Sequence, residues 1–201
     1  MRSLRISKIA SLVSYDTVFD VGADHGELEK ILSQSDNIKK IYAVENKKGP
    51  FLNLSHNVEG LTKVTSLLSN GIKDLKEDVN SLVIAGMGGI NIVEILLENE
   101  DKLQNVKEII LEPHSDYELV RRILVILDYK IDEEIKVTEA GKNYLITRFI
   151  KGKATYSNDI YRYGLHYNEE SNNLEELKVI NKRVKSTLIE KKLKELENHE
   201  N

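Results

Sequence analysis

The sequence predicts an α/β fold in which a mostly parallel sheet lies between two layers of helices. Two observations carry this prediction. Short apolar runs with strand character alternate with segments whose apolar residues recur at helical spacing. Glycine follows the first and the fourth of these runs, as is typical of the loops at one edge of a parallel sheet. The 201 residues suffice for one main domain and a short extension.

Five strands are predicted first, with helices between them. The predicted strands cover residues 17–21, 40–45, 64–68, 81–85 and 106–111. The last three are apolar enough to be buried on both faces of a parallel sheet. The predicted helices cover residues 26–32, 51–58, 90–97 and 117–127. Pro50 stands near the first turn of the second helix, where the missing backbone N–H is tolerated.

Two more strands complete the predicted sheet. Residues 130–137 and 144–150 both have strand character, and we expect them to pair antiparallel at one edge of a sheet of about seven strands. From Leu174 onward, apolar residues recur at helical spacing among lysines and glutamates, which predicts an amphipathic helix. We therefore expect a main domain over residues 1–152 and a helical, coiled-coil-like extension over residues 153–201.

The composition excludes several classes of protein. The chain has no cysteine, so disulfides, thiolate zinc sites and cysteine nucleophiles are excluded. No apolar run approaches the roughly 20 residues that a membrane crossing needs. The apolar stretch after the basic N-terminal residues is too short and too polar for a signal peptide. We expect a cytoplasmic protein without a metal ion, membrane contact or an obligatory protein partner.

The charge of the chain is unevenly distributed. The net charge is −4, which by itself argues against a nucleic-acid partner. Residues 1–140 carry 17 basic and 24 acidic residues, whereas residues 141–164 carry five basic residues and one acidic residue. A short basic segment therefore interrupts an acidic protein.

The segment 19–26 (FDVGADHG) is the sharpest local feature. It places Asp20, Gly22, Asp24 and Gly26 at alternate positions, where the first strand turns into a helix. Glycine lets a ligand approach the bare backbone, and the first amides of a helix have no partner. We expect a ligand here, because ligands bind at the carboxyl edge of such sheets. A calcium-type loop is the alternative, but the acidic set is short and runs directly into a helix.

The acidic residues of this loop discriminate between two cofactors. The pyrophosphate of NAD calls for the spacing G-x-G-x-x-G and would be repelled by Asp20 and Asp24. Two carboxylates suit the ammonium group of S-adenosylmethionine instead. Glu45, at the end of the second strand, is placed to accept hydrogen bonds from ribose hydroxyls, which either cofactor offers. The sequence therefore favours S-adenosylmethionine over NAD.

Further cofactor contacts are expected at the ends of the neighbouring strands. Asn46 follows Glu45, and Asn70 and Gly71 follow the third strand, where an amide can meet an adenine edge. The fourth strand ends in the sequence AGMGG, whose glycines let backbone lie against a flat ligand. The contacts expected from this segment are Ala85, Gly86, Met87 and Gly88. Ordinary tight turns are the alternative for both segments.

With these residues, the chain resembles the TrmK family of bacterial tRNA adenine-N1 methyltransferases. The matching segments, spread over about residues 5–150, are 20–25 (DVGADH), 49–51 (GPF), 83–89 (VIAGMGG), 111–113 (LEP) and 141–144 (GKNY). The resemblance implies a Rossmann-like class I methyltransferase fold, S-adenosyl-L-methionine as donor, S-adenosyl-L-homocysteine as product, adenine 22 of tRNA as target, and a C-terminal helical element that helps to hold tRNA.

The resemblance also assigns site residues. It places Asp20, Gly22 and Asp24 around the methionine end of the cofactor, Glu45 at the ribose and Asn70 near the adenine. Residues 85–89 would lie along the cofactor and target pocket. Arg5 matches a basic residue in the N-terminal helix of the family.

Several positions depart from the family pattern. Glu27 and Glu29 stand where the family has an aromatic residue and a proline. The family segment L-Q-P-N reads LEPH at residues 111–114, and Asn70 replaces a usual aspartate. A non-catalytic tRNA-binding relative and a methyltransferase with another RNA target therefore stay as alternatives, as does an NAD-dependent oxidoreductase.

Methyl transfer needs orientation more than a nucleophilic side chain. Adenine N1 already carries a lone pair, and methylation makes the ring cationic, so a nearby carboxylate would stabilise the product and accept a proton. Asp24 and Glu112 are the candidate acids, with His25 and His114 as hydrogen-bonding neighbours. Exposed positions at a strand end are the alternative for Glu112 and His114.

The basic segment is the expected contact with tRNA. Cations along phosphates, with aromatic rings available for stacking, are typical of RNA-binding surfaces. The expected cations are Arg5, Lys142, Arg148, Lys151, Lys153 and Arg162, interleaved with Tyr144, Tyr156, Tyr161 and Tyr163. A solvated surface is the alternative.

Overall fold

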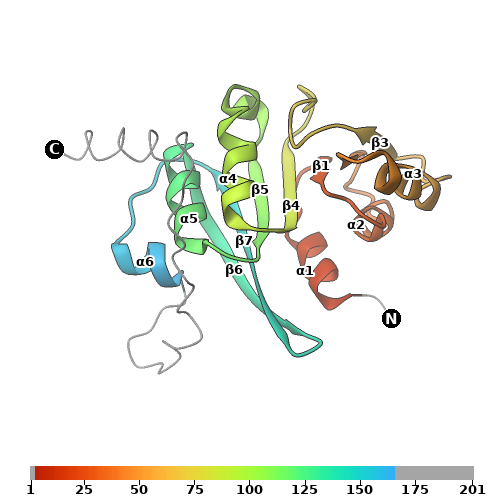
Figure 1. Ribbon diagram of the computed structural model, residues 1–201. Helices are drawn as coiled ribbons and strands as arrows, with labels where there is room; N and C mark the ends of the chain where they lie inside the picture. The colour runs from red at the N-terminus through yellow and green to blue at the C-terminus, as the bar shows by residue number, and fades with distance from the viewer. Residues whose placement is uncertain (1–2, 166–201) are drawn as a thin grey trace.

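The computed structural model describes residues 3–165 of the chain. One mixed sheet of seven strands, in the order β3-β2-β1-β4-β5-β7-β6, runs through these residues, with helices on both faces (Figure 1). The strands are β1 (Thr17–Val21), β2 (Lys40–Glu45), β3 (Val64–Leu68), β4 (Ser81–Met87), β5 (Glu108–Pro113), β6 (Tyr129–Glu139) and β7 (Lys142–Lys151). The seven-stranded α/β fold predicted from the sequence is confirmed.

The helices divide between the two faces of the sheet. They are α1 (Leu4–Leu12), α2 (Glu27–Leu32), α3 (Lys48–Asn57), α4 (Gly89–Leu97), a 3-10 helix (Glu100–Asn105), α5 (Tyr117–Ile126) and α6 (Asn158–Tyr163). Helices α4 and α5 pack with one set of strand side chains into the largest apolar core. Helices α1 and α2 pack with the alternate set, and α3 packs with residues beside them. The sheet is therefore covered on both faces.

The parallel part of the sheet is most buried at its centre. Every residue of β1 and β5 is buried, which fits the apolar runs of the sequence. The prediction that β3 is buried on both faces is wrong, because its residues are half-buried or exposed. β3 is an edge strand with only β2 as a neighbour, and the apolar content of a run does not reveal an edge position.

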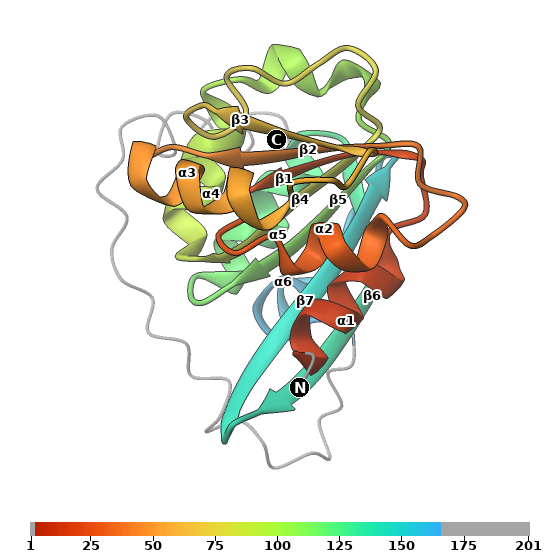
Figure 2. The same cartoon turned by 90° about the vertical axis from the view of Figure 1, so that its right-hand side faces the viewer.

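The expected antiparallel pair is present and longer than predicted. β7 pairs with β5 only through the register Glu108↔Ile150 to Leu111↔Thr147, while β6 and β7 pair along their whole lengths. The hairpin therefore extends past the carboxyl end of β5, with α1 beside it (Figure 2). This extension supplies one wall of the site described below.

Helix α1 begins the described chain and is tied to the far end of the hairpin. Ser3 caps the helix by accepting the N–H of Ile6. At the hairpin tip, the carboxylate of Glu139 accepts the N–H of Leu4 at 2.5 Å and the hydroxyl of Ser3 at 3.0 Å. These contacts fix the start of α1 beside the hairpin.

The other departures from the predicted elements are small. Helix α3 begins at Lys48, so Pro50 lies inside its first turn, where no intrahelical N–H bond is lost. Tyr156 lies before α6 and Ile160 lies within it, and both pack against the core formed with α4 and α5. The rest of the predicted C-terminal extension, including the amphipathic segment from Leu174, lies outside the described residues. Within residues 3–165, no helix is long and apolar enough to span a membrane.

Candidate active site

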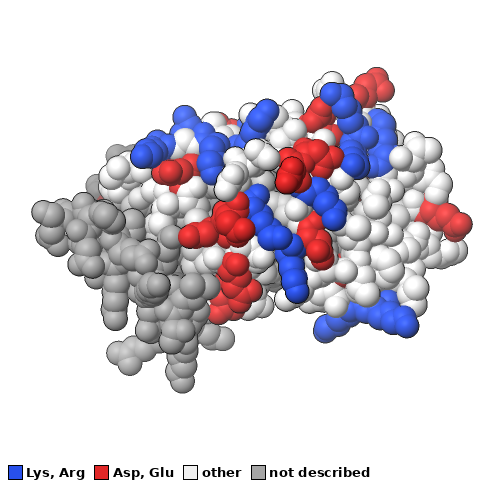
Figure 3. All heavy atoms as spheres, turned by 90° about the horizontal axis from the view of Figure 1, so that it is seen from above, with Lys and Arg blue, Asp and Glu red and all other residues white. Residues whose placement is uncertain are grey.

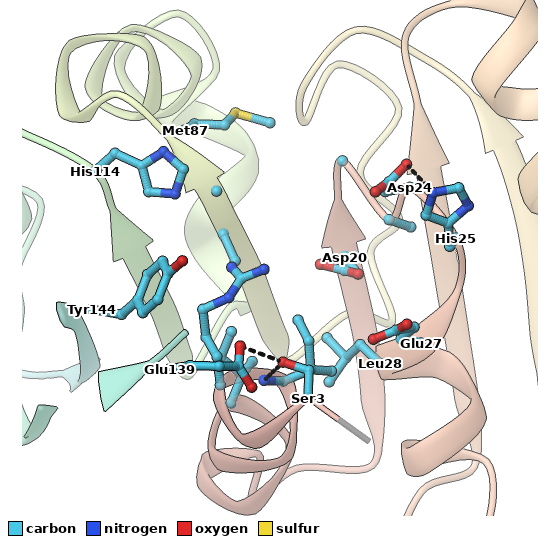
Figure 4. A pocket seen from close by; sticks show the side chains of 17 residues that line it. Ser3, Asp20, Asp24, His25, Glu27, Leu28, Met87, His114, Glu139 and Tyr144 are labelled. Carbon is cyan, nitrogen blue, oxygen red and sulfur yellow. Dashed lines mark hydrogen bonds and ion pairs between the residues drawn. The ribbon is translucent and has the colours of Figure 1, made fainter. Parts of the chain in front are cut away.

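Two adjoining cavities open at the carboxyl ends of the parallel strands. The larger, of about 660 Å³, is lined by residues from α1, the loop after β1, the end of β4 and the β6–β7 hairpin (Figure 4). The smaller, of about 350 Å³, lies over the ends of β2 and β3. Gly22 and Met87 line both. The strand order reverses between β1 and β4, which is where open α/β sheets bind ligands.

The loop after β1 is held in place by its own backbone. The N–H groups of Gly22 and Ala23 donate to the carbonyl oxygen of Val44, and the N–H of Asp24 donates to Glu45 Oε1 at 2.8 Å. Gly22 has a φ of +79°, and a Cβ there would meet the end of the Met87 side chain at 3.0 Å. Glycine at this position therefore keeps the junction of the two cavities open.

Gly26 has a different role from the one predicted for it. It lines neither of the two cavities. Its φ is +71°, and a Cβ at this position would lie 2.6 Å from the side chain of Val58. Gly26 therefore lets α2 begin close against the end of α3, which makes it a packing residue of the loop.

Asp20 is buried at the floor of the larger cavity, beside a second buried carboxyl group. Burial and the negative charge of Glu45 raise the pKa of Asp20 to about 6. Burial first, and then the Asp20 charge, raise the pKa of Glu29 well above its ordinary value. Neither oxygen of Glu29 meets an N–H or O–H donor among the described residues. The two carboxyl groups can therefore share a hydrogen bond only when one of them carries a proton.

Asp24 and His25 lie at the rim of the same cavity. Their side chains are 76% and 68% exposed, and His25 Nε2 lies 3.6 Å from Asp24 Oδ1. Asp24 has a φ of +49°, in the left-handed region. The two acids of the loop thus have different environments, since Asp20 is buried below the ligand space and Asp24 is exposed to solvent.

The smaller cavity collects the other predicted cofactor residues. Glu45, Asn46, Asn70 and Gly71 all line it. Glu45 is buried, and its Oε1 accepts the N–H of Asp24. Glu45 therefore links the end of β2 to the loop after β1, and it also faces the cavity. Residues 3–165 contain no group of three acidic or histidine side chains placed to hold a metal ion.

The glycines at the end of β4 serve separate purposes. Gly86 has a φ of +76° and stands at the irregularity between β4 and β5, where its N–H donates to Glu112 Oε2. Ala85, Gly86 and Met87 line the larger cavity. Gly88 lines neither of the two and precedes α4. A Cβ on Gly89 would meet the carbonyl oxygen of Ser115 at 2.4 Å, so Gly89 lets α4 start against the loop after β5.

Glu112 lies near the end of β5 and His114 directly after the strand, and the two residues differ in exposure. Glu112 is buried, so the alternative of an exposed strand-end acid is wrong for this residue. Its Oε2 accepts Arg5 Nη1 at 2.7 Å and the N–H of Gly86 at 3.0 Å. His114 is half exposed, and its Nε2 lies 3.6 Å from Glu112 Oε1. Arg5 therefore serves as counter-ion to an acid of the site.

Tyr144 completes this side of the site. The guanidinium of Arg5 lies over its ring at 5.1 Å, and the ring of His114 lies 6.4 Å away. Figure 4 shows His114 and Tyr144 on the same wall of the larger cavity, across from Asp20. Both residues also line a third cavity of about 390 Å³, together with Glu112, Tyr117 and Lys142.

The structure does not bring the six predicted RNA-binding cations together. Arg5 and Lys142 lie beside the cavities. Lys151, at the other end of β7, is about 30 Å from Lys142 at the usual rise per residue. Arg148 is 18% exposed and paired with Glu108 and Asp132. Seen from above, basic and acidic side chains are interspersed (Figure 3).

The last two predicted cations also lie away from the cavities. Lys153 follows Lys151 beyond the end of β7. Arg162, on α6, lies 3.8 Å from Glu118 of α5. Of the interleaved tyrosines, Tyr156 packs against the core and its hydroxyl bonds the backbone of Ile131. The basic segment is thus contiguous in sequence but divided in space.

Comparisons with known proteins agree with this architecture. A family model described as "Methyltransferase domain" matches residues 2–147. The tRNA (adenine(22)-N(1))-methyltransferase of Bacillus subtilis (strain 168) is 31% identical over 147 residues, 71% of this chain but only 62% of that protein. A candidate tRNA methyltransferase of Mycoplasma pneumoniae is 31% identical over 156 residues, which cover 75% of this chain and 72% of that protein.

Solved structures give the same result over a longer span. Sp1610 of Streptococcus pneumoniae, described as a candidate tRNA (m1A22) methyltransferase, was solved in complex with S-adenosyl-L-methionine. It is 32% identical to this chain, with a TM-score of 0.78 over 100% of this chain and 90% of the other. The seven-stranded sheet with a glycine-bearing acidic loop after β1 defines a class I methyltransferase. Within that class, the chain belongs to the TrmK-type tRNA (adenine-N1)-methyltransferase family.

Proposed function

We propose that the chain transfers a methyl group from S-adenosylmethionine to N1 of adenine 22 in tRNA. The observation that carries the proposal is the pair of joined cavities, with the buried carboxyl group of Asp20 in one and that of Glu45 in the other. Their volumes fall within the roughly 300 to 1,000 Å³ of small-molecule sites. The target follows the names of the Bacillus and Streptococcus relatives.

The residues that line the two cavities offer a partner for each part of S-adenosylmethionine. An ammonium group needs an anionic partner, and Asp20 is a buried acid at the floor of the larger cavity. Ribose hydroxyls need acceptors, and Glu45 faces the smaller cavity beside Asn46. An adenine needs a flat, partly apolar slot with an amide, which Asn70, Gly71 and Ile95 offer. A pyrophosphate would meet the carboxylates of Asp20 and Asp24 instead, which disfavours NAD.

The chain contributes binding, orientation and charge to the reaction. When bound, S-adenosylmethionine supplies a methyl group on a positively charged sulfur. The residues around the larger cavity orient the target base, and orientation of this kind is worth about 7 to 11 kcal/mol in well-aligned reactions. Glu112 places a buried negative charge on the wall of the target side, where it stabilises a base that becomes cationic. Asp24 and His25 line the entrance and are free to meet either ligand or solvent.

The proposed tRNA partner approaches the edge of the sheet that carries the cavities. Arg5 and Lys142 are the predicted cations at this edge, and Tyr144 lines the larger cavity with Arg5 and the third cavity with Lys142. Cations beside a half-buried aromatic ring on a cavity wall suit a phosphate backbone with a base turned out of its stack. The remaining predicted cations lie elsewhere on the molecule, so we place the entry of the base at Arg5, Lys142 and Tyr144.

The direct test is methyl transfer to unmodified tRNA with labelled S-adenosylmethionine, followed by mapping of the methylated base. We expect one label per tRNA, at N1 of adenine 22. Label at another base would redirect the proposal to a different RNA target. Tight binding of tRNA without label would instead make the chain a non-catalytic relative. Calorimetry with S-adenosylhomocysteine and with NAD provides the control, because binding of NAD alone would overturn the cofactor assignment.

A further inference from the structure

Glu112 carries one oxygen whose hydrogen bonds are incomplete. Its Oε2 is satisfied by Arg5 and by the N–H of Gly86. Its Oε1 is equally buried, yet among the described residues no donor lies within hydrogen-bond distance of it. A buried carboxylate oxygen without a donor is costly, so such atoms mark places where a partner is expected. His114 Nε2 lies 3.6 Å from this oxygen.

His114 is held at the backbone and is free at the ring. Its N–H donates to the carbonyl oxygen of Met87 at 2.8 Å, which fixes the residue at the end of β5. Its side chain is 50% exposed and lines both the larger and the third cavity. A small rotation of the ring is enough to turn the 3.6 Å approach into a hydrogen bond, and such bonds commonly tighten when ligand binds.

A hydrogen bond from His114 Nε2 to Glu112 Oε1 would decide which ring nitrogen carries the proton. A neutral imidazole has one N–H donor and one acceptor nitrogen, and the partner of one nitrogen sets the state of the other. Glu112 Oε1 can only accept, so Nε2 must donate to it. Nδ1 is then left as an acceptor on the side of the ring that points away from the buried acid.

We propose that His114 reads the exocyclic amine of the target adenine through Nδ1, and that Glu112 is the positioning residue that fixes this tautomer. The inference rests on the proposed function, since it assigns the base-recognising group of the same site. Adenine presents an N–H₂ donor at position 6, beside the N1 that is methylated. Guanine presents a carbonyl oxygen there, which would face the Nδ1 lone pair and be repelled.

His114 stands beside two aromatic residues and an acid that has one oxygen already bound. Arg5 occupies Glu112 Oε2, so Oε1 is left for His114. The ring of Tyr144 faces His114 from β7, and Tyr117 lines the third cavity from α5. Lys142 also lines that cavity.

The test is a thermodynamic cycle that removes the His114 side chain from the protein and the exocyclic amine from the base, singly and together. Two tRNAs are assembled from synthetic RNA pieces, one with adenine and one with purine at position 22, since purine lacks only the exocyclic amine. Dissociation constants and single-turnover rates are measured for the wild type and for His114→Ala. We expect the wild type to bind the adenine tRNA about tenfold more tightly than the purine tRNA, as for one buried hydrogen bond. His114→Ala should bind both equally.

Two conservative variants test whether His114 recognises the base or only supports the structure of the site. His114→Asn keeps an acceptor oxygen and should retain the preference for adenine over purine. Glu112→Gln offers Nε2 either a donor or an acceptor, so the tautomer is no longer fixed and the preference should shrink. Affinity for S-adenosylhomocysteine, measured by calorimetry, should change less than twofold in the His114 variants.

The outcomes distinguish the inference from the proposed function. If His114→Ala keeps the full preference for adenine, the inference is wrong even though methyl transfer stands. If the wild type fails to methylate the adenine tRNA, the proposed function fails, and the ratio of the two dissociation constants still decides whether His114 reads the amine. A preference for adenine that disappears only in His114→Ala and weakens in Glu112→Gln supports the inference.

Discussion

Glu29 is a carboxyl group without a hydrogen-bond donor among the described residues, buried beside Asp20 below the cofactor loop. A raised pKa in the folded state means that the folded chain binds a proton which the unfolded chain releases near pH 4. Stability is therefore highest below that value and falls as the pH rises through the raised pKa values of Glu29 and Asp20. The pair weakens the fold at neutral and alkaline pH.

We expect Glu29→Gln to raise the free energy of unfolding at pH 8 by about 1 to 3 kcal/mol, because the neutral amide can donate to the Asp20 carboxylate. At pH 4.5 the difference should nearly vanish, since both acids are then protonated in the wild type. Urea unfolding at the two pH values measures this. Glu27→Gln, two residues earlier on the exposed side of the helix, is the matched control and should change little at either pH.

Asp20 also predicts the pH dependence of cofactor binding. With a pKa of about 6, it is charged above that value and increasingly neutral below it. Affinity for S-adenosylhomocysteine should therefore be flat above pH 7 and fall by up to about tenfold per pH unit below pH 6. Calorimetry from pH 5 to 8 tests this. In Asp20→Asn we expect weak binding without that slope, and a slope that persists would assign the titration to another group.

Single residues also show what the sequence was able to predict. Asp20, Glu45 and Asn70 were identified from their positions near the ends of strands, and the structure places all three around the two cavities. Glu29 was noted only as a departure from the family pattern. A glutamate on a short charged helix gives no sign of burial, because burial depends on how α2 packs against the sheet. The pairing of Arg5 with Glu112, over a separation of 107 residues, was equally invisible in the sequence.

At the level of elements, the packing at the start of α4 requires glycine at position 89 but not at position 88. A Cβ on Gly89 would press against the backbone of Ser115, whereas a Cβ on Gly88 would meet no atom closer than 3.6 Å. We expect Gly89→Ala to lower the free energy of unfolding by about 1 to 3 kcal/mol, as in other overpacked sites. Gly88→Ala should be nearly neutral. Equal effects in a thermal or urea unfolding experiment would contradict the packing role of Gly89.

A buried ion pair fastens α6 to the domain. Arg121 Nε donates to Glu134 Oε1 at 2.8 Å, with both side chains at most 3% exposed, and Arg121 Nη1 donates to the carbonyl oxygen of Tyr161 at 3.0 Å. We expect Arg121→Ala to cost about 3 to 5 kcal/mol, because Glu134 is then buried without its counter-ion. Arg122→Ala, next in sequence but partly exposed, should cost about 1 kcal/mol or less. Urea unfolding of the two variants makes the comparison.

Elements with strong periodicity were predicted well, and those defined by tertiary contacts were not. The bounds of β1, β2 and β3 were predicted to the residue, since a glycine or a polar turn ends each run. The edge position of β3 and the length of the β6–β7 hairpin depend on which strands become neighbours. Helix α1 was expected only through the family resemblance, although Ile6, Ile9 and Leu12 recur at helical spacing.

For the whole molecule, the separation of the basic residues predicts where tRNA binds. Lys142 lies at the cavity edge of the sheet, and Lys153 follows the opposite end of β7. We expect Lys142→Ala to weaken tRNA binding and to reduce the dependence of log Kd on log salt by about one unit. Lys153→Ala, the matched control, should leave both unchanged. A larger effect at Lys153 in a salt titration would move the interface to the far edge of the sheet.

The tie between α1 and the hairpin tip has a consequence for the order in which the molecule assembles. The start of α1 is secured by Glu139, some 135 residues later in the chain, and Arg5 meets Glu112 only after β5 is made. During synthesis the first helix therefore leaves the ribosome long before its polar partners exist. The sheet from β1 to β5 can form in the meantime. The wall that α1 and the hairpin form around the larger cavity is then the last part to close, after the loop that follows β1 is already in place.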